Sequence, residues 1–168
     1  PGKNAEIRRD HTATVLSLGE GFNRQLLVNG VGITNFTPIT KIMAHMPLVA
    51  HPAPKSAVVI CFGMGTTFRS AMSWGVEVSA VELVGSVRDA FGFYFDDGPM
   101  LLRNPLGRVV IDDGRRFLQR SAQLFDVVTI DPPPPVEAAG SSLLYSKDFF
   151  EIVKKRLNRG GIMHHWLP

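Results

Sequence analysis

The sequence has little of what several classes of protein need. It holds one cysteine, Cys61, in 168 residues, so it cannot form an internal disulfide. Its five histidines do not cluster with cysteines, and the adjacent His164 and His165 would point to opposite faces of a strand. We therefore expect no metal site, and we expect Cys61, at the end of an apolar strand, to be a small buried residue rather than a nucleophile.

Long apolar runs and clustered positive charge are also missing. No stretch of about 18 apolar residues occurs, and the first residues, PGKNAEIRRDH, lack the apolar core of an export signal. We therefore expect this piece to lie in the cytoplasm or to face it. The net charge is +3, but the basic residues are spread out and none alternates with aromatics, so we expect no nucleic-acid partner.

Apolar residues make up 45% of the chain, enough to fill the core of one domain. Two strands joined by a glycine-rich turn are predicted first, as a hairpin over 11–18 and 25–31. Further strands are predicted at 57–61, up to Glu82, at 109–111, 125–130 and 162–166. Helices are predicted at 39–48, from the glycine turn to Gly75, and at 86–95, 115–121 and 147–157, with a loop over 132–142.

This alternation of strands and helices predicts an α/β fold. We expect a doubly wound, mainly parallel sheet of the Rossmann-like, S-adenosylmethionine-dependent methyltransferase-like kind, with an N-terminal β-hairpin. The division that we expect is a hairpin region over 1–37 and a nucleoside-binding domain over 38–168. A sheet of this kind normally adds two strands after the last one predicted here, which would leave that strand at the rim.

Residues 57–85, AVVICFGMGTTFRSAMSWGVEVSAVELVG, are the most informative stretch. They predict a βαβ unit with a glycine turn, Gly63-Met64-Gly65, after the first strand and Glu82 at the end of the second. Nineteen residues separate Gly63 from Glu82, close to the spacing at which a carboxylate of a dinucleotide fold meets the ribose hydroxyls. Phe68 replaces the third glycine of a GxGxxG motif, which favours an adenosyl-sulfonium ligand over NAD. The alternative is an ordinary turn with Glu82 merely solvated.

Three carboxylates, Glu82, Asp113 and Asp131, end predicted strands or begin the elements that follow them. The carboxyl ends of parallel strands are where ligands bind in an open sheet, so the fold would bring the three together. Asp113 could equally serve as the N-terminal cap of the helix after it.

The chain resembles the spermidine synthase (polyamine aminopropyltransferase) family over nearly its whole length. The matching stretches, in order, are LLVNGVGIT, AHMPLVAHPAPKSAVVI, GMGTTFR, VELV, DDGRRFL, FDVVTIDPPPP, AAGSSLLYSKDFF and LNRGGI. The resemblance implies that Gly63, Gly65 and Glu82 hold a nucleoside co-substrate, decarboxylated S-adenosylmethionine or S-adenosylmethionine itself. It implies that Asp113 receives the adenine amine and that Asp131 is the acid–base residue of an aminopropyl transfer to a small-molecule amine.

The resemblance also bears on assembly. The family implies a homodimer built partly through the hairpin region. The run DPPPPVEAAGSSLLYS looks closest to a bacterial branch in which such a domain follows membrane-spanning segments. That would make this chain the cytoplasmic domain of a longer membrane protein.

Several positions depart from the family pattern. Met64 and Pro134 stand where the family has aspartates, Ile33 stands where it has a glutamine, and 39–41 replace its Tyr-His-Glu. In the family these groups hold the ammonium groups of the donor and of the polyamine, and Lys41 would add a cation close to the acceptor pocket. We therefore expect an altered or lost polyamine site.

Three functions stay open from the sequence. The first is an aminopropyltransferase-like enzyme with an altered amine acceptor. The second is a methyltransferase that uses intact S-adenosylmethionine, because Met64 would tolerate a ligand carboxylate that an aspartate repels, and the DPPPP turn loosely resembles the D-P-P-x loop of amino-methylating enzymes. The third is a nucleoside-binding domain without catalysis.

Overall fold

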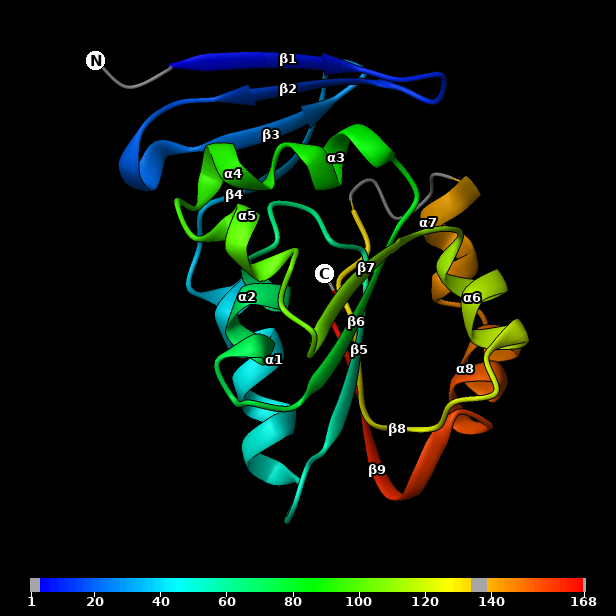
Figure 1. Cartoon of the computed structure of the whole chain (residues 1–168). Coiled ribbons are helices and arrows are strands. Elements are labelled where there is room, and N and C mark those ends of the chain that lie inside the picture. Colours follow the sequence, from blue (N-terminus) through cyan, green and yellow to red (C-terminus); the bar gives the residue numbers. More distant parts are fainter. Residues whose placement is uncertain (1–3, 134–138, 168) are drawn as a thin grey trace.

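The computed structural model describes residues 4–133 and 139–167. Figure 1 shows an antiparallel sheet at one end of the molecule and a parallel sheet with helices on both faces. This arrangement confirms the predicted α/β fold with a mainly parallel, doubly wound sheet. No helix in the described part of the chain is long and apolar enough to cross a membrane.

The N-terminal region forms four antiparallel strands rather than a two-stranded hairpin. They follow one another in the sheet as β1 (Ala5–Arg9), β2 (Thr14–Leu18), β3 (Gln25–Val28) and β4 (Val31–Asn35). A 3-10 helix, η1 (Gly21–Asn23), joins β2 to β3. Asn29 and Gly30 both have positive φ and form the two-residue turn between β3 and β4, as tight hairpins require. The predicted hairpin is therefore the inner pair of a larger sheet.

The main sheet is parallel throughout, in the order β7-β6-β5-β8-β9. Its strands are β5 (Ser56–Ile60), β6 (Glu77–Glu82), β7 (Gly107–Ile111), β8 (Phe125–Ile130) and β9 (Leu157–His165). Every residue of β5 and β8 is buried, as expected of central strands covered on both faces. The last strand lies at the rim, as predicted, although it begins at Leu157 and not near 162.

Helices cover both faces of this sheet (Figure 1). One face carries α1 (Ile39–Ala50) and α2 (Thr66–Met72), and the other carries α6 (Gly114–Arg120), α7 (Ala139–Leu144) and α8 (Lys147–Lys154). The helix predicted over 86–95 is two short helices, α3 (Gly85–Asp89) and α4 (Phe91–Tyr94), and α5 (Gly98–Leu101) follows them. The helix α7 occupies part of the predicted loop over 132–142.

The antiparallel sheet packs over the carboxyl ends of the parallel strands. Leu26 of β3 belongs to the same buried cluster as Val59 of β5 and Phe91 of α4. The buried hydroxyl of Tyr94 donates a hydrogen bond to Ser17 of β2 at 2.7 Å, which ties the two parts together. β3 and β4 therefore cover the carboxyl-end edge of the parallel sheet.

Candidate active site

A cavity of about 470 Å³ lies where the antiparallel sheet meets the carboxyl ends of the parallel strands. This volume is typical of small-ligand sites. Four carboxylates line it, and among the described residues no lysine, arginine or histidine does: Glu82, Asp112, Asp113 and Asp131. Carboxylates without a cationic side chain in the described lining favour a ligand that carries positive charge.

The two glycines of the turn after β5 have different surroundings. Both have positive φ, +55° at Gly63 and +82° at Gly65. A Cβ on Gly63 would meet only the Thr34 methyl, at 3.7 Å, and Gly63 lines the cavity. A Cβ on Gly65 would lie 2.5 Å from Cδ2 of Phe91 and 2.8 Å from Cζ of Phe62. Gly65 does not line the cavity, and its missing side chain makes room for the aromatic core.

Glu82 ends β6 and is bound to the turn beside it. Its Oε2 accepts hydrogen bonds from the backbone N–H groups of Phe62 at 3.1 Å and Gly63 at 3.3 Å, and its Oε1 accepts one from Val84 at 3.0 Å. Burial raises its pKa, and these N–H groups oppose the shift. A carboxylate has about four lone-pair sites, and the N–H of Leu83 also acts on this group, so little acceptor capacity is left for a ligand hydroxyl.

Asp113 caps α6 and also lines the cavity. Its Oδ1 accepts the backbone N–H of Arg116 at 2.8 Å. Among the described residues its second oxygen accepts no hydrogen bond, so capping and ligand contact are compatible. The neighbouring Asp112 forms an ion pair with the Arg116 side chain, which lowers the pKa of Asp112 against the effect of its burial.

Asp131 follows β8 and is half-buried, with its backbone N–H donating to the Ile60 carbonyl at 3.3 Å. Burial raises the pKa of its carboxyl, and His164 works against that shift. A raised pKa makes the carboxylate a better proton acceptor. Asp131 is therefore a candidate general base.

Of the five predicted site residues, Gly63, Glu82, Asp113 and Asp131 meet around one cavity, and Gly65 stands behind it. Cys61 also lines it, and burial, with Glu82, Asp131 and Asp113, raises the pKa of its thiol. A protonated thiol is a poor nucleophile, but Cys61 is only half-buried and not fully buried as expected.

Sequence reasoning missed Tyr145 and Trp166, which also line the cavity. The Tyr145 hydroxyl is buried and has no hydrogen-bond partner among the described residues. Its ring stacks on His165, with centroids 4.7 Å apart. Burial raises the pKa of Tyr145, and the charge of Asp131 adds to this. The available signal was their position in the chain: Tyr145 lies between α7 and α8, and Trp166 follows β9.

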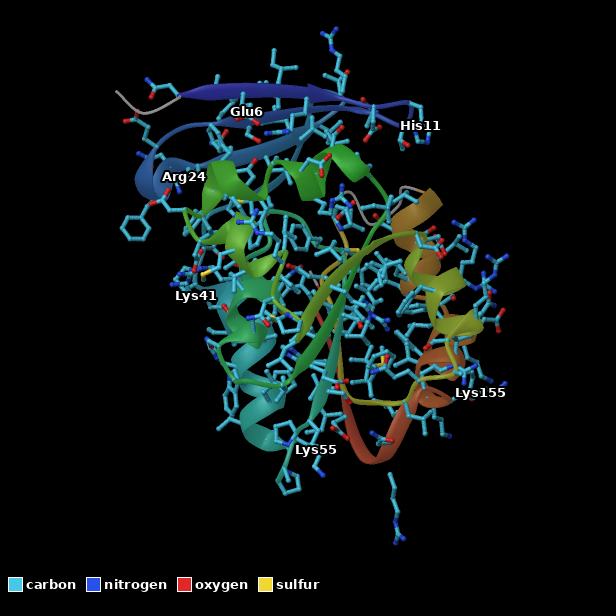
Figure 2. All side chains as sticks on the ribbon, in the orientation of Figure 1. Glu6, His11, Arg24, Lys41, Lys55 and Lys155 are labelled. Atoms are coloured by element: carbon cyan, nitrogen blue, oxygen red, sulfur yellow. The ribbon has the colours of Figure 1, made fainter. Side chains whose placement is uncertain are left out.

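The positions that depart from the family pattern fall partly in the cavity. Ile33 and Met64 line it, as do Ile39 and Thr40. Lys41 is exposed and does not line it, and Figure 2 shows this side chain on the outer surface. The lining of this cavity does not meet the expectation that Lys41 lies close to the acceptor pocket, because the first turn of α1 contributes Ile39, 43% exposed, and Thr40 instead. Pro134 lies outside the described residues.

A family model described as the Spermine/spermidine synthase domain matches residues 37–166. This chain belongs to that family. It is 28% identical over 164 residues to polyamine aminopropyltransferase 1 of Pseudomonas aeruginosa, which covers 94% of this chain and 57% of the relative. It is 34% identical over 125 residues to the polyamine aminopropyltransferase of Methanocaldococcus jannaschii, which covers 73% of this chain and 42% of the relative.

Solved structures show the same fold. The spermidine synthase of Thermotoga maritima superposes with a TM-score of 0.80 at 21% identity, over 96% of this chain and 56% of that one. A spermidine synthase in complex with the transition state analogue AdoDATO gives 0.82 at 21% identity, over 96% and 57%. The chain thus spans about half the length of the curated relatives and solved structures it matches.

Proposed function

We propose that this chain binds an adenosyl-sulfonium nucleoside, decarboxylated S-adenosylmethionine, and that it transfers the aminopropyl group to an amine. The observation that carries the proposal is the cavity itself. Four carboxylates line it and, among the described residues, no cationic side chain does. A sulfonium that bears an ammonium group has the complementary charge. Membership of the Spermine/spermidine synthase family supports the same chemistry.

The order of the strands divides the cavity into two ends. Glu82 and Asp113 follow β6 and β7 on one side of β5, and Asp131 follows β8 on the other. At the first end the free oxygen of Asp113 would accept the adenine amine and Oε1 of Glu82 a ribose hydroxyl. Gly63 allows close approach to the backbone because no Cβ intrudes. This orientation leaves the sulfur side of the ligand toward Asp131.

At the second end Asp131 would accept the proton that the attacking amine loses as the new bond forms. The electrophile is already activated by its positive sulfur, so holding the two reactants in line contributes much of the rest. Turnover therefore requires ionised Asp131, and its rate should rise with pH through the raised pKa of this group.

The polyamine part of the site is altered in this proposal. Met64 and Ile33 offer no charge to an ammonium, and both line the cavity. Each hydrogen bond between a carboxylate and a cation contributes about 1.5–3 kcal/mol. The loss of several such bonds would reduce the affinity for a di- or triamine by several powers of ten.

Met64 also favours a second candidate, a methyltransferase that uses intact S-adenosylmethionine. An aspartate at this position would repel the amino-acid carboxylate of that ligand, whereas the buried Met64, 3% exposed, would not. The remaining carboxylates of the cavity oppose this candidate, since they would repel the same group.

Calorimetry with methylthioadenosine and S-adenosylhomocysteine, side by side, tests the proposal. Methylthioadenosine should bind, and more tightly than S-adenosylhomocysteine, which carries an extra carboxylate. Glu82→Ala should abolish binding, while the matched control Glu77→Ala, at the exposed amino end of the same strand, should not. Tighter binding of S-adenosylhomocysteine would favour the methyltransferase. If neither bound at millimolar concentration, the nucleoside site would be refuted.

A further inference from the structure

Besides Asp131, the cavity lining includes the polar side chains of Tyr145 and Ser141, and the Ser141 hydroxyl donates to the Pro133 carbonyl at 2.7 Å. Trp166 lies beside Asp131, because its backbone N–H donates to the Ile130 carbonyl at 2.9 Å. Tyr145 lies at the same end, because its ring stacks on His165, which pairs with Ile130, the residue before Asp131. The buried Tyr145 hydroxyl, without a partner among the described residues, is therefore available to a ligand at this end.

Apolar groups form the opposite wall. The helix α1 crosses β8 and β9, where the Thr129 hydroxyl donates to the Met43 carbonyl at 2.9 Å. This packing brings Ile39 and Thr40, at the start of α1, to the Asp131 end. The Thr40 hydroxyl already donates to the Thr37 carbonyl at 3.0 Å. From above, β4 adds Ile33.

The charged side chains that the structure describes at this end match one nitrogen. Among the described residues, Asp131 is the carboxylate on this side of β5, since Glu82, Asp112 and Asp113 all follow β6 or β7. An acceptor with a single amine can place it on Asp131 and lay its body against Ile33 and Ile39. A diamine would place its second ammonium beside apolar side chains, which offer it neither a hydrogen bond nor an opposite charge.

We propose that the acceptor is a primary monoamine with an apolar alkyl or aromatic body, held at its nitrogen by Asp131 and Tyr145 and along its body by Ile33, Ile39 and Trp166. This assignment rests on the proposed aminopropyl transfer and names its substrate class.

The transfer balances with these groups alone. The lone pair of the neutral amine forms the new N–C bond to the methylene next to sulfur, and the C–S bond breaks with its electron pair left on sulfur. The products are a neutral thioether and a protonated secondary amine, and the carboxylate of Asp131 takes the proton. Tyr145 can hydrogen-bond the amine nitrogen, so we regard it as a positioning residue.

A series of acceptors tests the substrate class. n-Butylamine and putrescine share a four-carbon chain and differ by one amine, so they isolate the effect of the second charge. With decarboxylated S-adenosylmethionine as donor, kcat/KM for n-butylamine should exceed that for putrescine by at least about tenfold. It should rise by about fourfold per added methylene toward n-hexylamine, the effect of burying each CH₂. Equal or faster use of putrescine would overturn the assignment.

Two variants of α1 test whether Ile39 causes the preference for a monoamine over a diamine. Ile39→Asp adds a carboxylate to the wall and should cut the preference for n-butylamine at least about tenfold by improving putrescine. Ile42→Asp is the matched control, because Ile42 is similarly exposed, 47% against 43% for Ile39, and does not line the cavity. Equal responses of the two variants would contradict this wall. The wild-type comparison needs neither variant to fold.

Methylthioadenosine binding, measured on the same protein, separates the two levels of failure. If methylthioadenosine does not bind, the proposed aminopropyl transfer is refuted, and so is the monoamine assignment that depends on it. If methylthioadenosine binds but no monoamine is consumed, the nucleoside site stands and the acceptor assignment is overturned. Tyr145→Phe should raise KM for n-butylamine about tenfold with methylthioadenosine affinity unchanged. An unchanged KM would remove Tyr145 from the acceptor site.

Discussion

Alanine substitutions at the two glycines of the turn after β5 should have different effects, one on core packing and the other on ligand binding. Gly65→Ala would place a methyl group 2.5 Å from Cδ2 of Phe91 and 2.8 Å from Cζ of Phe62, at a φ of +82°. A left-handed conformation costs an alanine about 1–2 kcal/mol, and overpacking a core adds about 1–3 kcal/mol. We expect the free energy of unfolding to fall by about 2–5 kcal/mol.

Gly63→Ala is the matched comparison. Its φ of +55° carries a similar conformational cost, but its nearest neighbour, the Thr34 methyl, would be 3.7 Å away. The expected loss of stability is therefore only about 1–2 kcal/mol. Its methyl group would project into the cavity, so methylthioadenosine should bind at least about tenfold more weakly.

Urea unfolding followed by circular dichroism measures the difference. With an m-value near 2 kcal/mol/M, the midpoint should drop by about 1–2.5 M for Gly65→Ala and by about 0.5–1 M for Gly63→Ala. Equal midpoints for the two variants would refute the packing role given to Gly65. Wild-type affinity for methylthioadenosine in Gly63→Ala would refute close approach of the ligand to this turn.

Three further outcomes are expected. Asp131→Asn should lower turnover by about 10²–10⁴-fold and leave methylthioadenosine affinity within about threefold in calorimetry; retained turnover would exclude Asp131 as the base. Burial lowers the pKa of His165 to about 4 from 6.5, so the unfolded state binds its proton first and stability should fall as pH drops from about 6.5 toward 4. His165→Phe should weaken this dependence in urea titrations at pH 7.5 and 5, and an unchanged slope would contradict the burial effect. The exposed apolar side chains of Met46 and Val49 on α1, 55% and 71% exposed, favour a homodimer in sedimentation equilibrium at micromolar concentration; a soluble monomer would count against it.

The parallel sheet could be predicted because its central strands are short, fully buried apolar runs separated by helices. That topology alone predicted that Glu82, Asp113 and Asp131 would meet, since strand ends share one edge. β1 escaped prediction because its sequence, AEIRR, has little apolar alternation, and β4 because it contains a glycine and is largely exposed. Both strands form by pairing with a neighbour, which local sequence does not reveal.

The details of the site depend on contacts between distant residues. The hydrogen bonds from the N–H groups of Phe62 and Gly63 to Glu82 join residues about 20 positions apart. Only the folded turn shows that backbone N–H groups occupy most of the acceptor sites of this carboxylate. Tertiary packing likewise decides that Gly65 lies against Phe91 and that Lys41 is exposed. Residue type and spacing select the candidates, and the packing decides which of them face the cavity.

A crystal structure of the protein with methylthioadenosine tests the central claim most directly. We predict the adenine amine at the free oxygen of Asp113, a ribose hydroxyl on Oε1 of Glu82, and the sulfur on the Asp131 side of the glycine turn. Ligand density outside this cavity, or a ligand in it without contact to Glu82 and Asp113, would contradict the account.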